Sequence, residues 1–249
     1  MPHVTMSLQK RLERIEVSYH SIYQRRSFLV ARNERMTAIA GAVLFVLIII
    51  ELVVTANLRS LISAHIFVGV LLSGPLIVKM FSTGYRFLRY YTKSPNFIRK
   101  GPPNIWLRIL APFLVLTTLL VFISGFGLAV VGPTHKGLFL EIHAASVALW
   151  LPLIAVHVYA YIRKVPHLIA SDWRSQSLNW VAGRTGRLGV NISALLVGMV
   201  AAILMIPVSS SWNHWHTHQG VPAPLMVGIV AAIFAVMVAI PILRRTNKE

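Results

Sequence analysis

Six long apolar segments divide the chain, and the charged residues gather almost entirely between them. The segments cover residues 36–57, 61–80, 109–131, 138–162, 188–207 and 225–243. Each can cross about 30 Å of hydrocarbon as an α-helix, because such a helix rises about 1.5 Å per residue. The pattern predicts an all-α fold, a polytopic membrane bundle of six transmembrane helices.

Composition agrees with this pattern. The chain has 249 residues, of which 56% are hydrophobic and only 12% are charged, and its mean hydropathy is +0.68. A soluble domain of this length would not carry so much apolar surface. We therefore expect an integral, multi-pass protein that contacts the lipid bilayer, and we expect this bilayer to be a bacterial plasma membrane.

The positive charges predict the orientation of the helices. Lys and Arg remain on the cytoplasmic side when the loops are short. Residues 1–35, 81–108 and 163–187 and the tail together hold twenty-one of them, whereas the alternate loops hold only Arg59 and Lys136. Both termini are expected in the cytoplasm. The net charge of +17 is then a signal of topology, and we expect no nucleic-acid partner.

Three regions follow from the same pattern. Residues 1–35 form a basic cytoplasmic arm with apolar residues at helical spacing, which suits either an amphipathic helix on the inner leaflet or a short helix packed on the cytoplasmic loops. Residues 36–165 hold the first four spans. Residues 166–249 add two transmembrane helices, a His/Trp outer loop and a cytoplasmic tail.

Histidines inside the apolar segments are the candidate chemistry. His65 is the fifth residue of its segment and His143 the sixth of its own, and both segments are expected to start at the outer surface. The two imidazoles can therefore face each other and ligate one iron near the extracytoplasmic side. His157 follows His143 by fourteen residues, which is about 21 Å along nearly the same helix face. Lys79 lies opposite it, so a second site would lack its histidine.

Several neighbours could support a cofactor at the outer level. Gly125 and Gly127, beside Ser124, would permit close approach of a porphyrin edge, although small residues at helix contacts are also routine. Glu51 lies at the level of His65 and could accept a hydrogen bond from an axial imidazole, pass protons, or pair with Arg59. The cations available for haem propionates near the outer face are Arg59 and Lys136.

The chain has no cysteine. This excludes disulfides, thiolate-ligated iron–sulfur clusters and covalently attached c-type haem. Any redox cofactor must be held without covalent attachment, through histidine or similar ligands.

Three segments carry a resemblance to a known group of proteins: SAHIFVGVLLSGPLIVK, FISGFGLAVVGP and EIHAASVALWLPLIAVH. Together they resemble b-type cytochromes whose haem lies in a four-helix membrane bundle, with histidine ligands on the second and fourth helices. The resemblance covers about residues 36–165. It implies one haem b held by His65 and His143. Members often bind a second haem, and here His157 is the candidate ligand, but Lys79 departs from the pattern.

The outer loop between the last two segments offers a separate metal hypothesis. His214, His216 and His218 alternate there beside Trp212 and Trp215. Alternate imidazoles can bind Cu(II), Zn or Ni if the loop is extended. Interfacial tryptophans are also common without any metal, and docking of an outer redox partner is a further use.

The sequence favours an electron-transfer subunit of an oxidoreductase over a self-sufficient enzyme. Electrons would pass through a bis-histidine haem between a quinone pool and an extracytoplasmic redox protein or partner subunit. The alternative is a small membrane transporter or metal-handling protein, in which Glu51, the membrane histidines and the outer histidine loop form a cation path.

Overall fold

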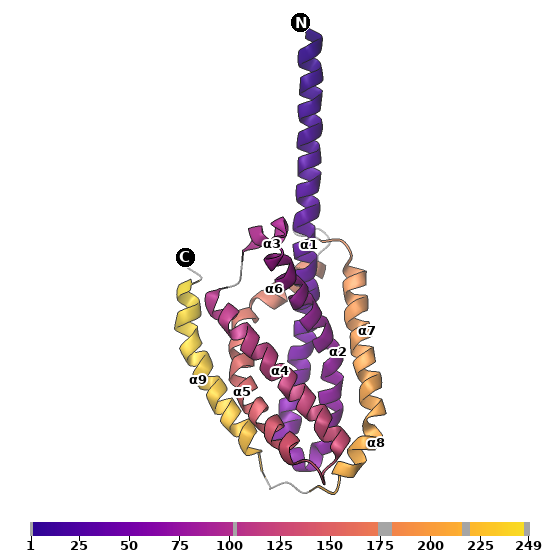
Figure 1. Cartoon of the computed structure of the whole chain (residues 1–249), viewed down its shortest axis with the longest axis vertical. Helices are drawn as coiled ribbons and strands as arrows, with labels where there is room; N and C mark the ends of the chain where they lie inside the picture. The colour runs from indigo at the N-terminus through magenta and orange to yellow at the C-terminus, as the bar shows by residue number, and fades with distance from the viewer. Residues whose placement is uncertain (1, 102–103, 174–180, 216–219, 247–249) are drawn as a thin grey trace.

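The computed structural model is helical throughout the part of the chain that it describes (Figure 1). It describes the backbone of residues 2–101, 104–173, 181–215 and 220–246, and the side chains of these segments from residue 28 to residue 244. The elements are α1 (Pro2–Ala56), α2 (Leu58–Tyr91), α3 (Pro95–Lys100), α4 (Ile105–Val131), α5 (Gly137–Tyr161), α6 (Lys164–Trp173), α7 (Arg184–Leu204), α8 (Ile206–Ser209), η1 (Ser210–Trp212) and α9 (Ala223–Thr246).

Six of the described helices are long and apolar enough to cross a membrane, which confirms the all-α polytopic bundle. They lie at Phe28–Ala56, Leu58–Tyr91, Ile105–Val131, Gly137–Tyr161, Arg184–Leu204 and Ala223–Arg244. The N- and C-terminal ends of the chain lie at the same end of the bundle (Figure 1). This is the arrangement that six crossings require. We call this the inner end, because the basic loops predicted to be cytoplasmic lie there.

The basic arm is part of α1 and continues the first span without a break. It runs straight away from the inner end of the bundle (Figure 1). The arm's last residues already belong to the bundle, since Val30 and Arg35 are buried and Asn33 donates a hydrogen bond to the Ser82 carbonyl of α2 at 3.0 Å. Contact of the arm with lipid remains a prediction.

Two helical hairpins form the centre, and the last two long helices flank it. α1 packs along α2, and α4 packs along α5. The additional helices do not form a unit of their own: α7 packs on α2 and α9 packs on α5, at opposite sides of the bundle (Figure 1). The segment containing α8 and η1 lies at the outer end and contacts α2 and α4.

Glycine permits the close crossing of α2 and α7. A Cβ at Gly74 would collide with the Ala194 carbonyl, and a Cβ at Gly198 would lie 2.5 Å from the Leu71 carbonyl oxygen. Helices in lipid gain stability from such backbone approach, because lipid is as apolar as their side chains and burial alone drives little association. The flanking position of α7 therefore depends on these two glycines.

An apolar cluster fills the middle of the bundle. Leu44 of α1 and Val68 and Leu72 of α2 are buried in it, and Phe122 of α4 packs against them. On α2 this cluster lies between His65 and Lys79, and so separates an outer polar region from an inner one.

Replacing Gly74 with Ala should lower the thermal stability of the detergent-solubilised protein, because the new methyl group meets the backbone of α7. Overpacking of this kind costs about 1–3 kcal/mol. Gly84→Ala is the matched control on the same helix, since nothing lies within 4 Å of a Cβ there. Equal melting temperatures for the two variants would contradict the crossing.

Candidate functional site at the outer histidine pair

The fold brings His65 of α2 and His143 of α5 together near the outer end. Their ring centroids lie 6.2 Å apart, with an angle of 72° between the ring planes. The residues are 78 positions apart in sequence, and their helices belong to different hairpins. The sequence prediction placed both at the same depth on these two helices, and the structure places them in ring-to-ring proximity.

Hydrogen bonds at Nδ1 orient both rings. The Nδ1 of His65 contacts the Glu51 carboxylate and lies 3.2 Å from the Thr55 hydroxyl. The Nδ1 of His143 lies 3.1 Å from the Val121 carbonyl oxygen and 3.1 Å from the Ser124 hydroxyl. A carbonyl or a carboxylate can only accept, so Nδ1 carries the proton in each neutral ring.

This tautomer leaves both Nε2 atoms with a lone pair. None of the described residues hydrogen-bonds either Nε2. Histidines that ligate a metal typically donate their other N–H to a carboxylate or a backbone carbonyl, which fixes the ring and raises its basicity as a ligand. Glu51 and Val121 supply one acceptor of each kind.

The separation of the rings fits a shared iron. With a metal-to-nitrogen bond of about 2.0 Å and about 1.1 Å from nitrogen to ring centre, two axial imidazoles have centroids about 6 Å apart. The packing near the rings is also close: a Cβ at Gly125 would lie 3.2 Å from Cε1 of His143, and the neighbouring Ser124 and Ser146 are almost fully buried. The donor set and the spacing therefore suit bis-histidine haem.

The other residues predicted to support the site lie in different surroundings, and only Glu51 contacts a histidine of the pair. Gly127 faces the Phe139 ring, which a Cβ would meet, so a side-chain contact explains this glycine. Lys136 donates to the Pro133 carbonyl at 3.0 Å. Arg59 is exposed in the first turn of α2. Glu51 contacts His65 rather than Arg59, and its Oε2 is buried with no hydrogen-bond partner in the part of the chain described.

The inner candidates form a different arrangement. The His157 ring packs against Tyr161 with centroids 5.0 Å apart. Lys79 is half-buried and donates to the Thr37 carbonyl of α1 at 3.2 Å. Its side chain therefore turns toward α1. A second haem at His157 remains a prediction.

The outer loop can be assessed only in part. His214 is exposed, whereas His216 and His218 lie outside the described residues. Trp212 is 3% exposed, and Asn213 accepts a hydrogen bond from Ser63 at 2.8 Å, which ties this segment to the start of α2. Within the described ranges no three His, Asp or Glu side chains group closely enough to hold a metal ion.

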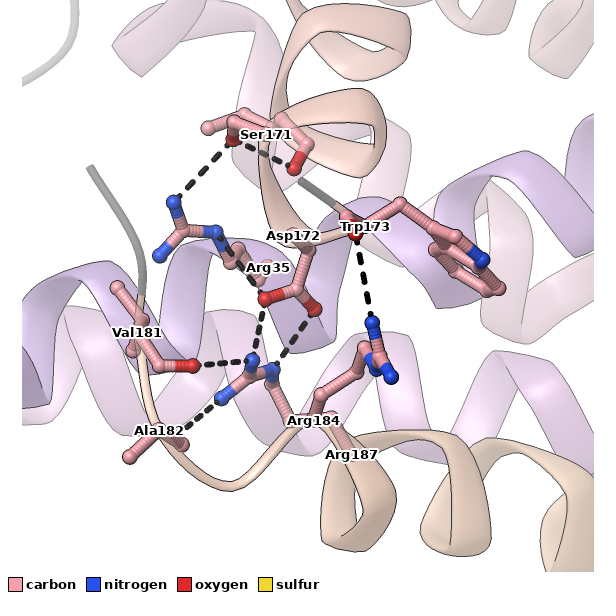
Figure 2. A network of polar contacts seen from close by, with 9 residues as sticks. Arg35, Ser171, Asp172, Trp173, Val181, Ala182, Arg184 and Arg187 are labelled. Atoms are coloured by element: carbon pink, nitrogen blue, oxygen red, sulfur yellow. Dashed lines mark hydrogen bonds and ion pairs between the residues drawn. The ribbon is translucent and has the colours of Figure 1, made fainter. Parts of the chain in front are cut away.

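Sequence reasoning missed a buried charge network at the inner end (Figure 2). Asp172 at the end of α6 is 1% exposed and contacts two arginines. Arg187 of α7 binds both of its carboxylate oxygens, and Nε of Arg35 on α1 lies 3.4 Å from one of them. Arg187 also donates to the Val181 and Ala182 carbonyls at 2.9 and 2.8 Å.

This network links three helices that are remote in sequence. Ser171 extends it, since its hydroxyl lies 3.2 Å from a guanidinium nitrogen of Arg35. The arginines had been interpreted only as a topology signal. Asp172 was the available clue, because the chain has only seven acidic residues and this one lies among basic ones.

A second acidic residue organises the inner surface. Glu34 of α1 lies 3.2 Å from Lys100 of α3, 3.4 Å from Lys164 of α6 and 3.8 Å from Arg86 of α2. One carboxylate thus gathers cations from three other elements. Each of these half-exposed ion pairs contributes little to the free energy of unfolding. Together they bring α3 and α6 to the same carboxylate on α1.

The chain gives no match when it is compared with protein-family models, with curated proteins or with solved structures. We therefore infer its function from the geometry of the site.

The Asp172→Asn variant should be destabilised by about 3–5 kcal/mol, because it leaves two buried guanidiniums without their shared carboxylate. Thermal unfolding in detergent measures this loss. Glu141→Gln is the control, since Glu141 is exposed on α5. If the Asp172→Asn variant has the same melting temperature as the wild type, the network does not hold α6 and α7 to α1.

Proposed function

We propose that the protein is a membrane b-type cytochrome that carries single electrons through one haem held between His65 and His143. The observation that supports this most directly is the histidine pair itself. Its centroids are 6.2 Å apart, both Nδ1 atoms are engaged by protein acceptors, and both Nε2 atoms are left for a metal.

The chain's own residues have distinct roles in this proposal. His65 and His143 would hold the iron, and with both imidazoles bound it would have no position open to a substrate. Glu51 and the Val121 carbonyl fix the ring orientations and increase the electron donation of the imidazoles. Arg59 lies at the outer end of α2, and Lys136 directly precedes α5. These two cations are suited to the haem propionates. The bound haem would supply a one-electron Fe(III)/Fe(II) couple.

Six-coordinate haem suits electron transfer better than substrate chemistry, so we assign the chain as an electron-transfer subunit. The outer position of the site favours a redox protein on the extracytoplasmic side as one partner. The membrane location favours a quinone pool as the other. The plasma membrane of a bacterium fits both.

The first test is the optical spectrum of the purified protein. The wild type should show the reduced-minus-oxidised bands of haem b, and His65→Ala and His143→Ala should each lose them because one axial ligand is gone. His167→Ala is the control, since this histidine is exposed on α6. Full haem content in both ligand variants would reject the site. A wild type without haem that conducts cations would favour the transporter alternative.

The second test addresses Glu51. Glu51→Gln should raise the haem reduction potential, because a neutral amide attracts the imidazole N–H proton less strongly than a carboxylate does, so the ring donates less electron density to the iron and stabilises Fe(III) less. A tenfold change in the relative stability of the two iron states corresponds to about 59 mV. Potentiometric titration measures the shift, with Glu141→Gln as the surface control. An unchanged reduction potential in Glu51→Gln would show that the carboxylate does not influence the iron.

A further inference from the structure

Cations from three elements converge on one carboxylate at the inner end of the bundle, where α3 and α6 lie beside α1 (Figure 1). The Glu34 carboxylate lies 3.8 Å from a guanidinium nitrogen of Arg86 on α2. The ammonium groups of Lys100 and Lys164 lie 3.2 and 3.4 Å from it. We call these four residues the inner charge cluster. Three positive charges surround one negative charge, so the cluster has an excess of two positive charges.

The chain supplies no second carboxylate for this excess among the residues whose side chains are described. Glu34 is the only acid within ion-pair distance of the three cations in these segments. Asp172 is engaged by Arg35 and Arg187. Uncompensated cations at the cytoplasmic surface of a membrane attract anions from outside the chain.

The cations of the cluster are accessible, and its carboxylate is covered. The side chains of Arg86, Lys100 and Lys164 are 30%, 42% and 46% exposed, whereas that of Glu34 is 11% exposed. An anion that approaches from outside therefore meets the positive groups first. Glu34 holds these groups together from the inner side.

Packing at the end of α2 fixes the cluster in place. Phe97 of α3 is 2% exposed and packs edge-on against Tyr85 of α2, with ring centroids 5.7 Å apart. The backbone amide of Ser94 donates to the Arg89 carbonyl at 3.0 Å. These contacts fold α3 back along α2 and bring Lys100 to the carboxylate. The cations are thus arranged before any ligand binds, which lowers the entropy cost of binding.

The same end of α2 offers a further donor and an apolar surface. Arg89, one turn beyond Arg86, has a buried Nε with no hydrogen-bond partner among the described residues. Phe81 and Ile77 are exposed and precede Arg86 by five and nine residues, which places them about 8 and 14 Å deeper along the helix. A ligand with an anionic head and long apolar chains can contact both levels of α2.

We propose that the inner charge cluster binds the phosphate of an anionic phospholipid from the inner leaflet, whose acyl chains lie along the exposed apolar side chains of α2. A guanidinium matches the geometry of a phosphate, and ammonium groups add point charges to it. A zwitterionic lipid brings its own cation, so it gains less from the excess charge. A soluble anion gains nothing from the apolar side chains. The inference goes beyond the proposed electron carrier and does not depend on a haem.

Native mass spectrometry of the full-length protein in detergent, titrated with dimyristoyl phosphatidylglycerol, tests the site. The wild type should bind this lipid about tenfold more tightly than dimyristoyl phosphatidylcholine, which has the same chains. The double variant Arg86→Gln/Lys164→Gln should bind phosphatidylglycerol about thirtyfold more weakly, as expected when two cations near an anionic lipid are removed. Arg86→Lys/Lys164→Arg keeps both charges and should retain most of the affinity.

The matched control is Lys93→Gln/Arg163→Gln, which removes the same charge from exposed positions outside the cluster. It should change the affinity less than threefold. Equal losses in the two neutralised variants would overturn the site, because the attraction would then come from the basic surface as a whole. The preference of the wild type for phosphatidylglycerol over phosphatidylcholine tests the proposal without any variant, and equal affinities for the two lipids would also overturn it.

Inorganic phosphate is the third probe, and it distinguishes a lipid from a soluble anion. It should displace phosphatidylglycerol no better than sodium chloride does at the same ionic strength, because both then act only by screening. Displacement by phosphate beyond this effect would overturn the assignment to a lipid. A wild type that lacks haem but shows the expected lipid preference would contradict the cytochrome and support the lipid site.

Discussion

A chain that crosses a bilayer six times must satisfy its buried polar groups internally, because the hydrocarbon core provides no water. This chain has twenty-four Lys and Arg residues and only seven acidic residues. The position of each acidic residue therefore decides which buried basic groups have a carboxylate partner. Three of the acidic residues organise the bundle. Glu51 orients His65, Asp172 joins α6 and α7 to α1, and Glu34 gathers α2, α3 and α6 at the inner surface.

The polar groups within the membrane are divided between two levels. The outer level has hydrogen-bond acceptors for both imidazole Nδ1 atoms, and among the described residues it leaves the two Nε2 atoms and the Oε2 of Glu51 without partners. At the inner level Lys79 donates to the Thr37 carbonyl, and the His157 ring packs against Tyr161. Leu44, Val68, Leu72 and Phe122 lie between the levels. Water and protons would cross this apolar layer with difficulty, whereas electrons can tunnel through it, and this suits the proposed carrier.

The flanking helices α7 and α9 stabilise this arrangement from opposite sides. α7 approaches α2 through Gly74 and Gly198, and α9 approaches α5 through Gly228, where a Cβ would lie 2.5 Å from Leu151. Each of the helices that carry the histidine pair thus packs against a flanking helix as well as against its hairpin partner. The sequence alone predicts one additional region for the two flanking helices, because they are consecutive in the chain.

The amino-acid sequence alone predicts the six spans, their order, the orientation expected from the basic loops, and the matched depth of His65 and His143. These follow from local rules, since hydrophobic length and distance from a helix end can be counted along one segment. The packing of the helices, in contrast, is needed to see that Glu51 pairs with His65 rather than Arg59, that Lys79 turns toward α1, and that Asp172 binds Arg35 and Arg187. Each of these depends on the rotation of one helix against another. That rotation is set by packing between side chains remote in sequence, which no periodicity within a single segment records.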